Sequence, residues 1–291
     1  MFELSLAGVL DLHIHCDPDT KQRNVSDITM AKRCIQSGMR GFLIKSHDWS
    51  THCRAAMAQA VVTGCEVLGA VCLNFTHGER VNPFVVQQAC HTLGSRCRCV
   101  WLPTRDSDFD MRRQGLRGVP VVDEYGNVLP EVIRCMEICA AENIALASGH
   151  SSSSETLALA KAAREVGVQK FIVTHATSDP WQIPKDVVKR CFEYGAFVEH
   201  SYLALIWGPG SPFPYFNPCP VEEMMEYIRI CPEQTLLSSD LGTAGMILPD
   251  EGISNFMKIL YDNDFTVDEI DAMFKHIPAY LMGLPRIDAT S

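Results

Sequence analysis

The chain has 291 residues, 47% of them hydrophobic and 21% charged, with a formal net charge of −10 at pH 7. These values are typical of a soluble globular protein, and the acidic balance argues against nucleic acid as a partner, because nucleic-acid-binding surfaces are rich in Lys and Arg. No apolar run approaches the roughly 18 residues of a membrane span, and no basic segment precedes the first apolar stretch, so we expect neither a membrane anchor nor a signal peptide.

The thirteen cysteines are scattered along the chain and include no Cys-x-x-Cys pair. Several lie inside apolar runs, as Cys72 and Cys139 do. We therefore expect reduced thiols that pack as small core residues, in a cytoplasmic protein.

Apolar runs typical of strands alternate with patterns typical of helices along the chain. The first strand is predicted at residues 9–15, and Ser26 and Gly38 are expected to begin and end the helix that follows it. Further strands are predicted at residues 41–47, 67–73, 97–102, 144–149, 170–174, 196–199 and 235–239. The helices between them are predicted at about residues 51–60, 82–94, 130–142, 152–167, 184–194 and 220–230.

Regular alternation of this kind indicates right-handed βαβ units and a parallel sheet. Eight units predict a closed (β/α)8 barrel of the TIM type, with residues 1–291 forming a single domain. The polar, glycine-rich stretch at residues 104–130 is predicted as an excursion after the fourth strand, with a small hairpin at residues 119–128. In such barrels the functional residues gather at the C-terminal ends of the strands.

Residue types that bind metal ions end four of the predicted strands. In the first strand, His13 and His15 are two residues apart, so both are expected on one face while Leu12 and Ile14 pack the other way. Three later strands end in His150, His175 and Asp240. Imidazole and carboxylate groups together suit zinc, manganese, iron or cobalt, and we expect one or two ions, with zinc favoured.

Three more residues are candidates for contacts with a small-molecule substrate. Arg105, just after the fourth strand, is suited to pair with a substrate carboxylate, although an ion pair with Asp106 or Asp108 is an equal alternative. His200 on the seventh strand and Trp207 before an aromatic loop are candidates for the pocket wall, and a purely structural role is the alternative for each.

In type and strand order, these histidines and Asp240 resemble the metal site of the amidohydrolase superfamily. The segment 277–284, Ile-Pro-Ala-Tyr-Leu-Met-Gly-Leu, is similar to the Asn-Pro-Ala-x-x-Leu-Gly-Leu segment that follows the last barrel strand in many members. More narrowly, Asp-Leu-His-Ile-His at residues 11–15 and Leu-Ile-Lys-Ser-His at residues 43–47 resemble an uncharacterised branch of amidohydrolase-like proteins.

The resemblance implies a metal-dependent hydrolase that cleaves a C–N or C–O bond of a small molecule, such as an amide, a cyclic amide or a lactone. A metal-activated water would attack the scissile carbonyl, and Asp240 would accept the proton of that water and pass it to the leaving group. The resemblance also implies a homo-oligomer.

The chain departs from the family pattern at the fourth strand, which ends in Pro103 and Thr104, whereas binuclear members usually carry a bridging carboxylated lysine or glutamate on strand four or three. Lys45, which shares a face with His47 at the end of the second strand, is the available substitute. The alternative is a charged Lys45 that contacts substrate or Asp240 beside a single metal ion. For His47 we weigh a ligand, a substrate contact or a general acid against a structural hydrogen bond.

Three other functions fit parts of the same pattern. A PHP-type phosphoesterase also opens with Asp-x-His-x-His, but it closes with Asp-x-His, whereas this chain has Asp240-Leu241-Gly242. A metal-dependent decarboxylase uses a similar set of His and Asp residues on the same kind of barrel. A barrel that binds a ligand without turnover is the third alternative, because a fold does not determine a function.

Overall fold

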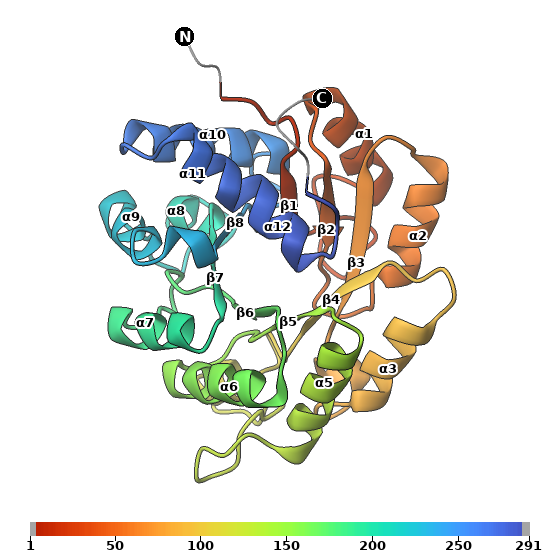
Figure 1. Ribbon diagram of the computed structural model, residues 1–291, viewed down its shortest axis with the longest axis vertical. Coiled ribbons are helices and arrows are strands. Elements are labelled where there is room, and N and C mark those ends of the chain that lie inside the picture. The colour runs from red at the N-terminus through yellow and green to blue at the C-terminus, as the bar shows by residue number, and fades with distance from the viewer. Residues whose placement is uncertain (1–3, 287–291) are drawn as a thin grey trace.

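Eight parallel strands follow one another around a ring in the computed structural model, which describes residues 4–286 (Figure 1). Each strand pairs with the next one along the chain, and a parallel bridge between Ile14 and Leu241 joins the first strand to the loop after the last. The sheet is therefore a barrel, and the predicted (β/α)8 architecture is confirmed. The strands are β1 Leu10–Ile14, β2 Gly41–Ile44, β3 Glu66–Cys72, β4 Cys97–Trp101, β5 Ala145–Ala147, β6 Phe171–Val173, β7 Phe197–Ser201 and β8 Thr235–Ser238.

Helices surround the ring of strands. The longer ones are α1 Asp27–Ser37, α2 His52–Val61, α3 Pro83–His91, α5 Pro130–Ala141, α6 Ser153–Val166, α7 Lys185–Glu193, α9 Val221–Ile228 and α10 Pro249–Asp262. The shorter ones are η1 Phe75–His77, α4 Asp108–Arg112, α8 Leu203–Ile206, η2 Pro232–Gln234, α11 Val267–Asp271, η3 Ala272–His276 and α12 Ile277–Leu281. The expected cap forms at α1, where the Ser26 hydroxyl accepts a hydrogen bond from the Thr29 N–H and Gly38 ends the helix with a φ of 78°. Within residues 4–286, no helix combines the length and the apolar character that crossing a membrane requires.

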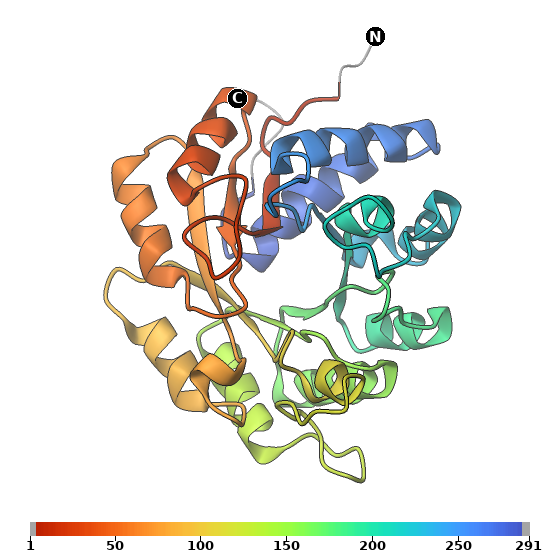
Figure 2. The ribbon, with the colours of Figure 1, turned by 180° about the vertical axis from the view of Figure 1, so that it is seen from behind.

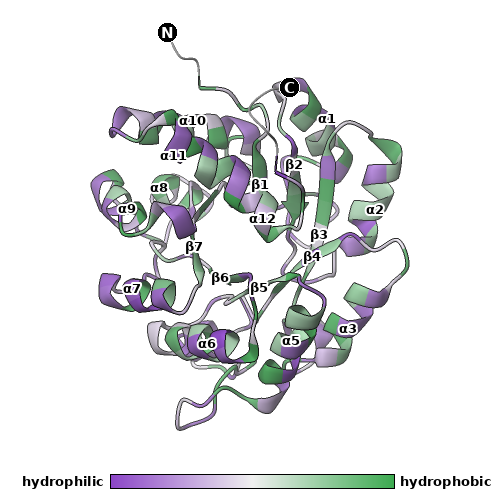
Figure 3. Ribbon diagram, in the orientation of Figure 1, coloured by the Kyte–Doolittle hydropathy of each residue, from purple (hydrophilic) through white to green (hydrophobic). Residues whose placement is uncertain are grey.

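Apolar side chains fill the inside of the barrel and the layer between strands and helices. Figure 3 shows hydrophobic residues along the strands and a mixture of polar and apolar residues on the helices around them. All thirteen cysteines are free thiols, and ten of them are buried, as expected for core residues. Burial raises the pKa of thiols such as Cys72 and Cys135 to about 12, so these groups are unreactive packing residues.

The C-terminal segment closes the N-terminal end of the barrel, and α12 lies across the middle of the ring in Figure 1. The ring of Tyr280 lies 5.7 Å from that of Phe197 at the start of β7. Met282 lines a small cavity inside the barrel. Figure 2 views the opposite end, where the loop after β1 and the short helix α4 lie in front of the strands. The C-terminal ends of the strands therefore remain available for a site.

The first strand contains a β-bulge. Asp11 pairs with Phe42 and Ile14 pairs with Ile44, so three steps along β1 match two steps along β2. Leu12 lines the cavity inside the barrel together with Trp101, whose ring also lies 5.7 Å from that of His13. The expectation that Leu12 packs away from the histidines is therefore wrong, because the bulge interrupts the regular alternation.

The excursion between β4 and α5 contains α4 and irregular loops. The hairpin expected at residues 119–128 is reduced to a single antiparallel bridge between Val122 and Val128. Val119 pairs elsewhere: its N–H donates to the Asp106 carbonyl at 2.8 Å, and its carbonyl accepts from the Asp108 N–H at 3.1 Å. The middle of the excursion, at Val119, therefore pairs with the residues just before and at the start of α4.

The loop after β8 lies so close to β1 that no side chain fits at Gly242. Its φ is 122°, and a Cβ there would lie 1.8 Å from the carbonyl oxygen of His15. We predict that Gly242→Ala lowers the free energy of unfolding by about 3 kcal/mol or more, because it adds a steric clash to backbone strain. Gly94→Ala, where φ is 74° and no atom lies within 4 Å, should cost about 1 kcal/mol. Chemical denaturation measures both losses, and equal losses would contradict the prediction.

Candidate metal centre

The C-terminal ends of β1, β6 and β8 bring three metal-binding side chains together. His13, His175 and Asp240 each offer one atom within 4.8 Å of the others, and all three residues are buried. The Nε2 atom of His13 lies 2.9 Å from Asp240 Oδ1, and the Nε2 atom of His175 lies 3.8 Å from Asp240 Oδ2. His15 Nε2 lies 3.2 Å from Asp240 Oδ1. Histidines that are far apart in the sequence thus all face the Asp240 carboxylate.

The backbone is strained at two of these residues. His175 has a φ of 60° and Asp240 has a φ of 53°, both in the left-handed region. Among residues 4–286, the other non-glycine residues with positive φ are Asn143 and Asp264. A left-handed non-glycine residue costs about 1–3 kcal/mol and persists where the surrounding structure demands it. The structure therefore holds His175 and Asp240 in an unfavourable backbone conformation at these two strand ends.

His13 faces a conflict between two polar neighbours. Its Nδ1 atom lies 2.8 Å from Glu199 Oε1, so that N–H donates to the carboxylate. Its Nε2 atom faces Lys45 Nζ at 2.8 Å and Asp240 Oδ1 at 2.9 Å. One ring nitrogen cannot both accept from the ammonium and donate to the carboxylate. A bound cation would remove the conflict, because a lone pair on Nε2 and a carboxylate oxygen could both face it.

The electrostatics of the cluster suit a cation. Burial alone would lower the pKa of His13, but the carboxylates of Asp240 and Glu199 raise it to about 9. Burial alone would raise the pKa of Asp240, yet the imidazoles of His13 and His15 hold it well below its usual range. Burial lowers the pKa of His175 well below its usual range, so this ring is neutral. A buried anionic carboxylate thus lies beside a neutral imidazole.

His150, just after β5, extends the cluster. Its Nδ1 atom lies 2.7 Å from Asp110 Oδ2, to which it donates. The Nε2 atom is then the acceptor of the ring, and it is buried without a hydrogen-bond partner in the part of the chain that the structure describes. The ring lies 5.2 Å from that of His175. Imidazoles that bind metals usually donate their other N–H to a carboxylate in this way, so His150 fits a ligand position.

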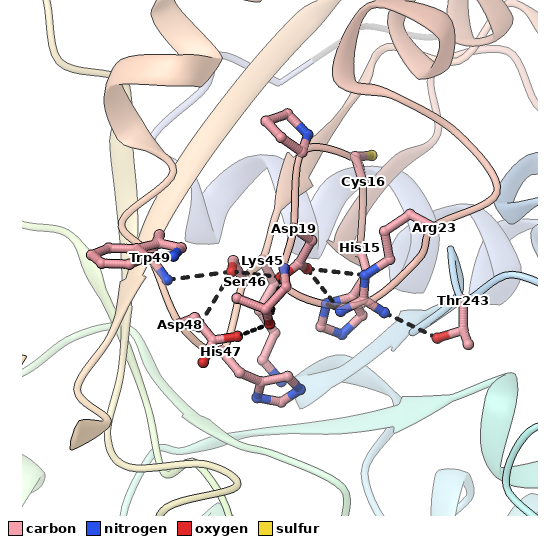
Figure 4. Close-up of polar contacts among 12 residues, drawn as sticks. His15, Cys16, Asp19, Arg23, Lys45, Ser46, His47, Asp48, Trp49 and Thr243 are labelled. Atoms are coloured by element: carbon pink, nitrogen blue, oxygen red, sulfur yellow. Dashed lines mark hydrogen bonds and ion pairs between the residues drawn. The ribbon is translucent and has the colours of Figure 1, made fainter. Parts of the chain in front are cut away.

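His15 is held differently from the other histidines. Arg23 Nη2 lies 3.3 Å from its Nδ1 atom, and Arg23 is itself paired with Asp19 at 2.8 Å (Figure 4). Arginine only donates hydrogen bonds, so Nδ1 accepts and the ring proton lies on Nε2, where it donates to Asp240 Oδ1. A ligand role for His15 through Nε2 would therefore require the loss of that proton.

Lys45 and His47 extend from the end of β2 toward the same opening, beside His15 in Figure 4. Lys45 is 1% exposed, and its Nζ atom lies 5.3 Å from the centre of the Trp101 ring. The ring of His47 stacks on that of His15 at 5.2 Å between centroids, and its Nδ1 atom lies 2.8 Å from Thr104 Oγ1. The side chains of Lys45 and His47 therefore line one cavity.

This inner cavity has a volume of about 170 Å³ and shares much of its lining with an outer cavity of about 560 Å³. Trp207 lines the inner cavity and is nearly buried, and its indole N–H donates to the Asn217 carbonyl at 2.9 Å. Phe213 and Phe216 from the aromatic loop line both cavities. Arg105 lines the outer cavity and is paired with Asp48. The cavities thus have an aromatic side and a basic side.

His200 does not belong to this opening. It is fully buried, its Nδ1 atom lies 3.0 Å from Thr177 Oγ1, and its ring lies 6.1 Å from that of Tyr227 in α9. The neighbouring Glu199 points into the barrel toward His13. Successive side chains of a strand point to opposite faces, so the expectation that His200 contacts substrate is wrong.

Three residues at the site were not found from the sequence. Glu199 contacts His13, and Asp110 contacts His150 and also accepts the indole N–H of Trp181 at 2.7 Å. The Trp181 ring lies 4.0 Å from that of His150. Glu199 carried a signal, because it is an acidic residue inside a predicted strand. Asp110 lies in the short helix α4 and Trp181 lies in an irregular segment, and neither stretch is long enough for a periodicity that would indicate the direction of its side chains.

The available donors fit a divalent metal ion. Imidazole nitrogens and a carboxylate are the ligands that zinc and its first-row neighbours take in proteins. A bound cation would relieve the conflict at His13 Nε2, and it would give the Nε2 atom of His150 the partner that it lacks among the residues that the structure describes. The residues that fit this role directly are His13, His175 and Asp240, with His150 beside them.

Comparison with known protein families gives one match. The model of a family described as "Family of unknown function (DUF6282)" matches residues 8–199, which is more than half of the chain. No curated protein matches the chain.

Several solved structures share the fold. An organophosphorus hydrolase from Deinococcus radiodurans is 12% identical, with a TM-score of 0.61 over 97% of this chain and 94% of that one. A mutant of a PTE-like lactonase from Deinococcus radiodurans is 11% identical, with a TM-score of 0.58 over 97% and 98%. YJJV, a TatD homolog from Escherichia coli K12, is 13% identical, with a TM-score of 0.60 over 96% and 100%. At such identities the likeness shows the barrel fold, so function must be argued from the site.

We predict that Glu199→Gln weakens the binding of Zn²⁺ by about 10- to 100-fold, because an amide orients and polarises His13 less well than a carboxylate does. Glu233→Gln, an exposed position in η2, is the matched control and should leave the affinity unchanged. Competition with a chromophoric chelator measures both affinities. If the two variants bind Zn²⁺ equally well, the Glu199 carboxylate does not strengthen metal binding through His13.

Proposed function

The chain belongs to the family of unknown function DUF6282, and from the geometry of its barrel mouth we propose that it is a metal-dependent hydrolase of the amidohydrolase type. Its substrate is a small molecule, in which it cleaves a C–N or C–O bond of an amide, a cyclic amide or a lactone. The observation that carries the proposal is the convergence of His13, His175 and Asp240 beside the partnerless nitrogen of His150.

The structural neighbours support the same reaction class. Two of them are an organophosphorus hydrolase and a mutant of a PTE-like lactonase. The barrel and the placement of the ligand-type residues at the strand ends match what the resemblance to the amidohydrolase superfamily implies. A lactone is therefore the first substrate to test.

The metal would be held by His13, His175 and Asp240, with His150 and Lys45 available for a second ion. When bound, a divalent cation lowers the pKa of water and polarises a carbonyl oxygen. Zinc is the ion that we favour, because imidazole and carboxylate ligands suit it. Side chains that line the inner cavity would supply the other catalytic groups.

Asp240 is well placed to accept a proton. Its Oδ1 atom is occupied by His13 and His15, whereas Oδ2 has His175 at 3.8 Å and faces the inner cavity. The neighbouring imidazoles keep the carboxylate ionised at neutral pH. Asp240 accepts a proton from the attacking water and returns it to the leaving group, which requires a carboxylate within hydrogen-bond reach of both.

His47 is suited to donate a hydrogen bond, because burial lowers its pKa well below the usual range and keeps the ring neutral. Thr104 is fully buried, and its hydroxyl oxygen accepts a hydrogen bond from Asn74 Nδ2 at 2.6 Å. The hydroxyl hydrogen then has His47 Nδ1 as its acceptor at 2.8 Å, which places the ring hydrogen of His47 on Nε2. His47 lines both cavities, so this N–H is available to the carbonyl oxygen or the leaving group of a substrate.

We further propose that Lys45 is carboxylated. Its amine nitrogen forms a bond to the carbon of carbon dioxide and releases a proton, which gives an anionic carbamate. Two carbamate oxygens could bridge two metal ions, and the change from ammonium to carbamate removes the donor that competes for His13 Nε2. Burial of Lys45 at the end of β2 would protect the carbamate from water.

Carbon-13 NMR tests the carbamate. After reconstitution with zinc and ¹³C-bicarbonate, the native protein should give a carbamate resonance that Lys45→Met lacks. Lys170→Met is the matched control, because Lys170 is 3% exposed but lies at the start of β6, at the opposite end of the barrel, and should keep the signal. If the native protein lacks the resonance, Lys45 is not carboxylated and is instead a positively charged residue that contacts substrate or Asp240.

Activity on a small panel of lactones, amides and cyclic amides tests the reaction. We expect hydrolysis by the metal-loaded protein, loss on chelation and recovery when metal is restored. His47→Ala should lower kcat by about 100-fold with bound metal unchanged, because it removes a hydrogen-bond donor that stabilises developing negative charge. His91→Ala, at an exposed histidine paired with Glu142, should change neither quantity. Metal-loaded protein that hydrolyses no member of the panel would contradict the proposed function.

A further inference from the structure

The outer cavity is lined by two chemically different groups of residues. One group is apolar: Pro180, Trp181, Pro212, Phe213, Pro214, Tyr215 and Phe216. The other group contains three cations, Lys21, Arg105 and Arg113. The cavity volume of about 560 Å³ accommodates a small organic molecule whose reactive bond enters the inner cavity.

The carboxylates around this opening are already engaged. Asp19 pairs with Arg23, Asp48 pairs with Arg105 and accepts from the Thr20 hydroxyl, and Asp110 accepts from His150 and Trp181. Each of these carboxylates therefore already has a hydrogen-bond or ionic partner in the structure.

Two of the three cations in the lining, Lys21 and Arg113, differ from Arg105 in their contacts. Within residues 4–286, neither side chain forms a hydrogen bond or an ion pair with a carboxylate; Arg113 lies 5.6 Å from the centre of the Phe109 ring. Lys21 lines both the inner and the outer cavity. Partial burial and the nearby charges of Arg105 and Arg23 lower the pKa of Lys21, while the Asp19 carboxylate opposes this shift. A bound anion would favour the charged form of the Lys21 side chain, as an opposite charge does.

We propose that the substrate carries an anionic group, a carboxylate or a phosphate, which binds Lys21 and Arg113 while its apolar body lies against Trp181. This inference rests on the proposed function, because it names the substrate class of the same site. It also reassigns the recognition of a substrate anion, since the expected partner, Arg105, is already paired with Asp48. Guanidinium and ammonium groups bind both kinds of anion through charge-assisted hydrogen bonds.

Calorimetric binding of three probes tests the inference without turnover. The probes are 3-phenylpropionate, its neutral amide and phenyl phosphate, each titrated into metal-loaded and into chelated native protein. We expect at least one anionic probe to bind about 10-fold more tightly than the amide, and the tighter of the two identifies the group. No detectable binding of either anion, or equal binding of the amide, overturns the inference.

Charge variants locate the binding site. Lys21→Met and Arg113→Met should each weaken binding of the preferred anion by about 10-fold without changing binding of the amide, and Lys21→Arg should retain it. Lys161→Met, at an exposed position of α6, is the control and should have no effect. An anion that binds the metal directly would be insensitive to Lys21→Met and would overturn the inference.

The two proposals fail in different ways. If the native protein holds no metal and hydrolyses nothing but still discriminates anions through Lys21, the proposed function fails and the anion site stands. If the metal-loaded protein hydrolyses neutral lactones and Lys21→Met binds anions like the native protein, the proposed function stands and the anion site fails.

Discussion

The contact between Asp240 and His13 is the interaction on which the rest of the site depends. The Asp240 N–H donates to the His13 carbonyl at 2.9 Å, and the Asp240 carboxylate lies 2.9 Å from His13 Nε2. The first contact joins the end of the last strand to the first strand, and the second brings the two candidate ligands together. The same two residues therefore contribute both to the closure of the barrel and to the assembly of the site.

His13, His15 and His150 are each oriented by the group that contacts the Nδ1 atom of the ring. Carboxylates lie behind His13 and His150, so these rings donate from Nδ1 and direct Nε2 toward the centre. Arg23 lies behind His15, which reverses the tautomer and makes His15 a donor to Asp240. The partners of these imidazoles thus determine which Nε2 atoms have a lone pair available for a cation and which donate a hydrogen bond.

Local patterns in the sequence were enough to predict the eight strands, the barrel and the positions of His13, His175 and Asp240 at strand ends. The direction of Leu12 was not predictable, because the bulge arises from pairing between β1 and β2. Periodicity also could not decide which of Glu199 and His200 faces the barrel axis, since that choice depends on the register of β7 in the closed sheet. The excursion that carries Asp110 takes its position from tertiary packing alone.

Metal content per chain is the most direct test of this account. Protein purified after growth with added zinc or manganese should contain at least one ion per chain by elemental analysis. A variant with His13→Ala and His175→Ala should contain none, while a variant with His77→Ala, in η1 away from the cluster, should match the native protein. Native protein without metal, or the double variant with undiminished metal, would contradict the claim that these strand ends form a metal centre.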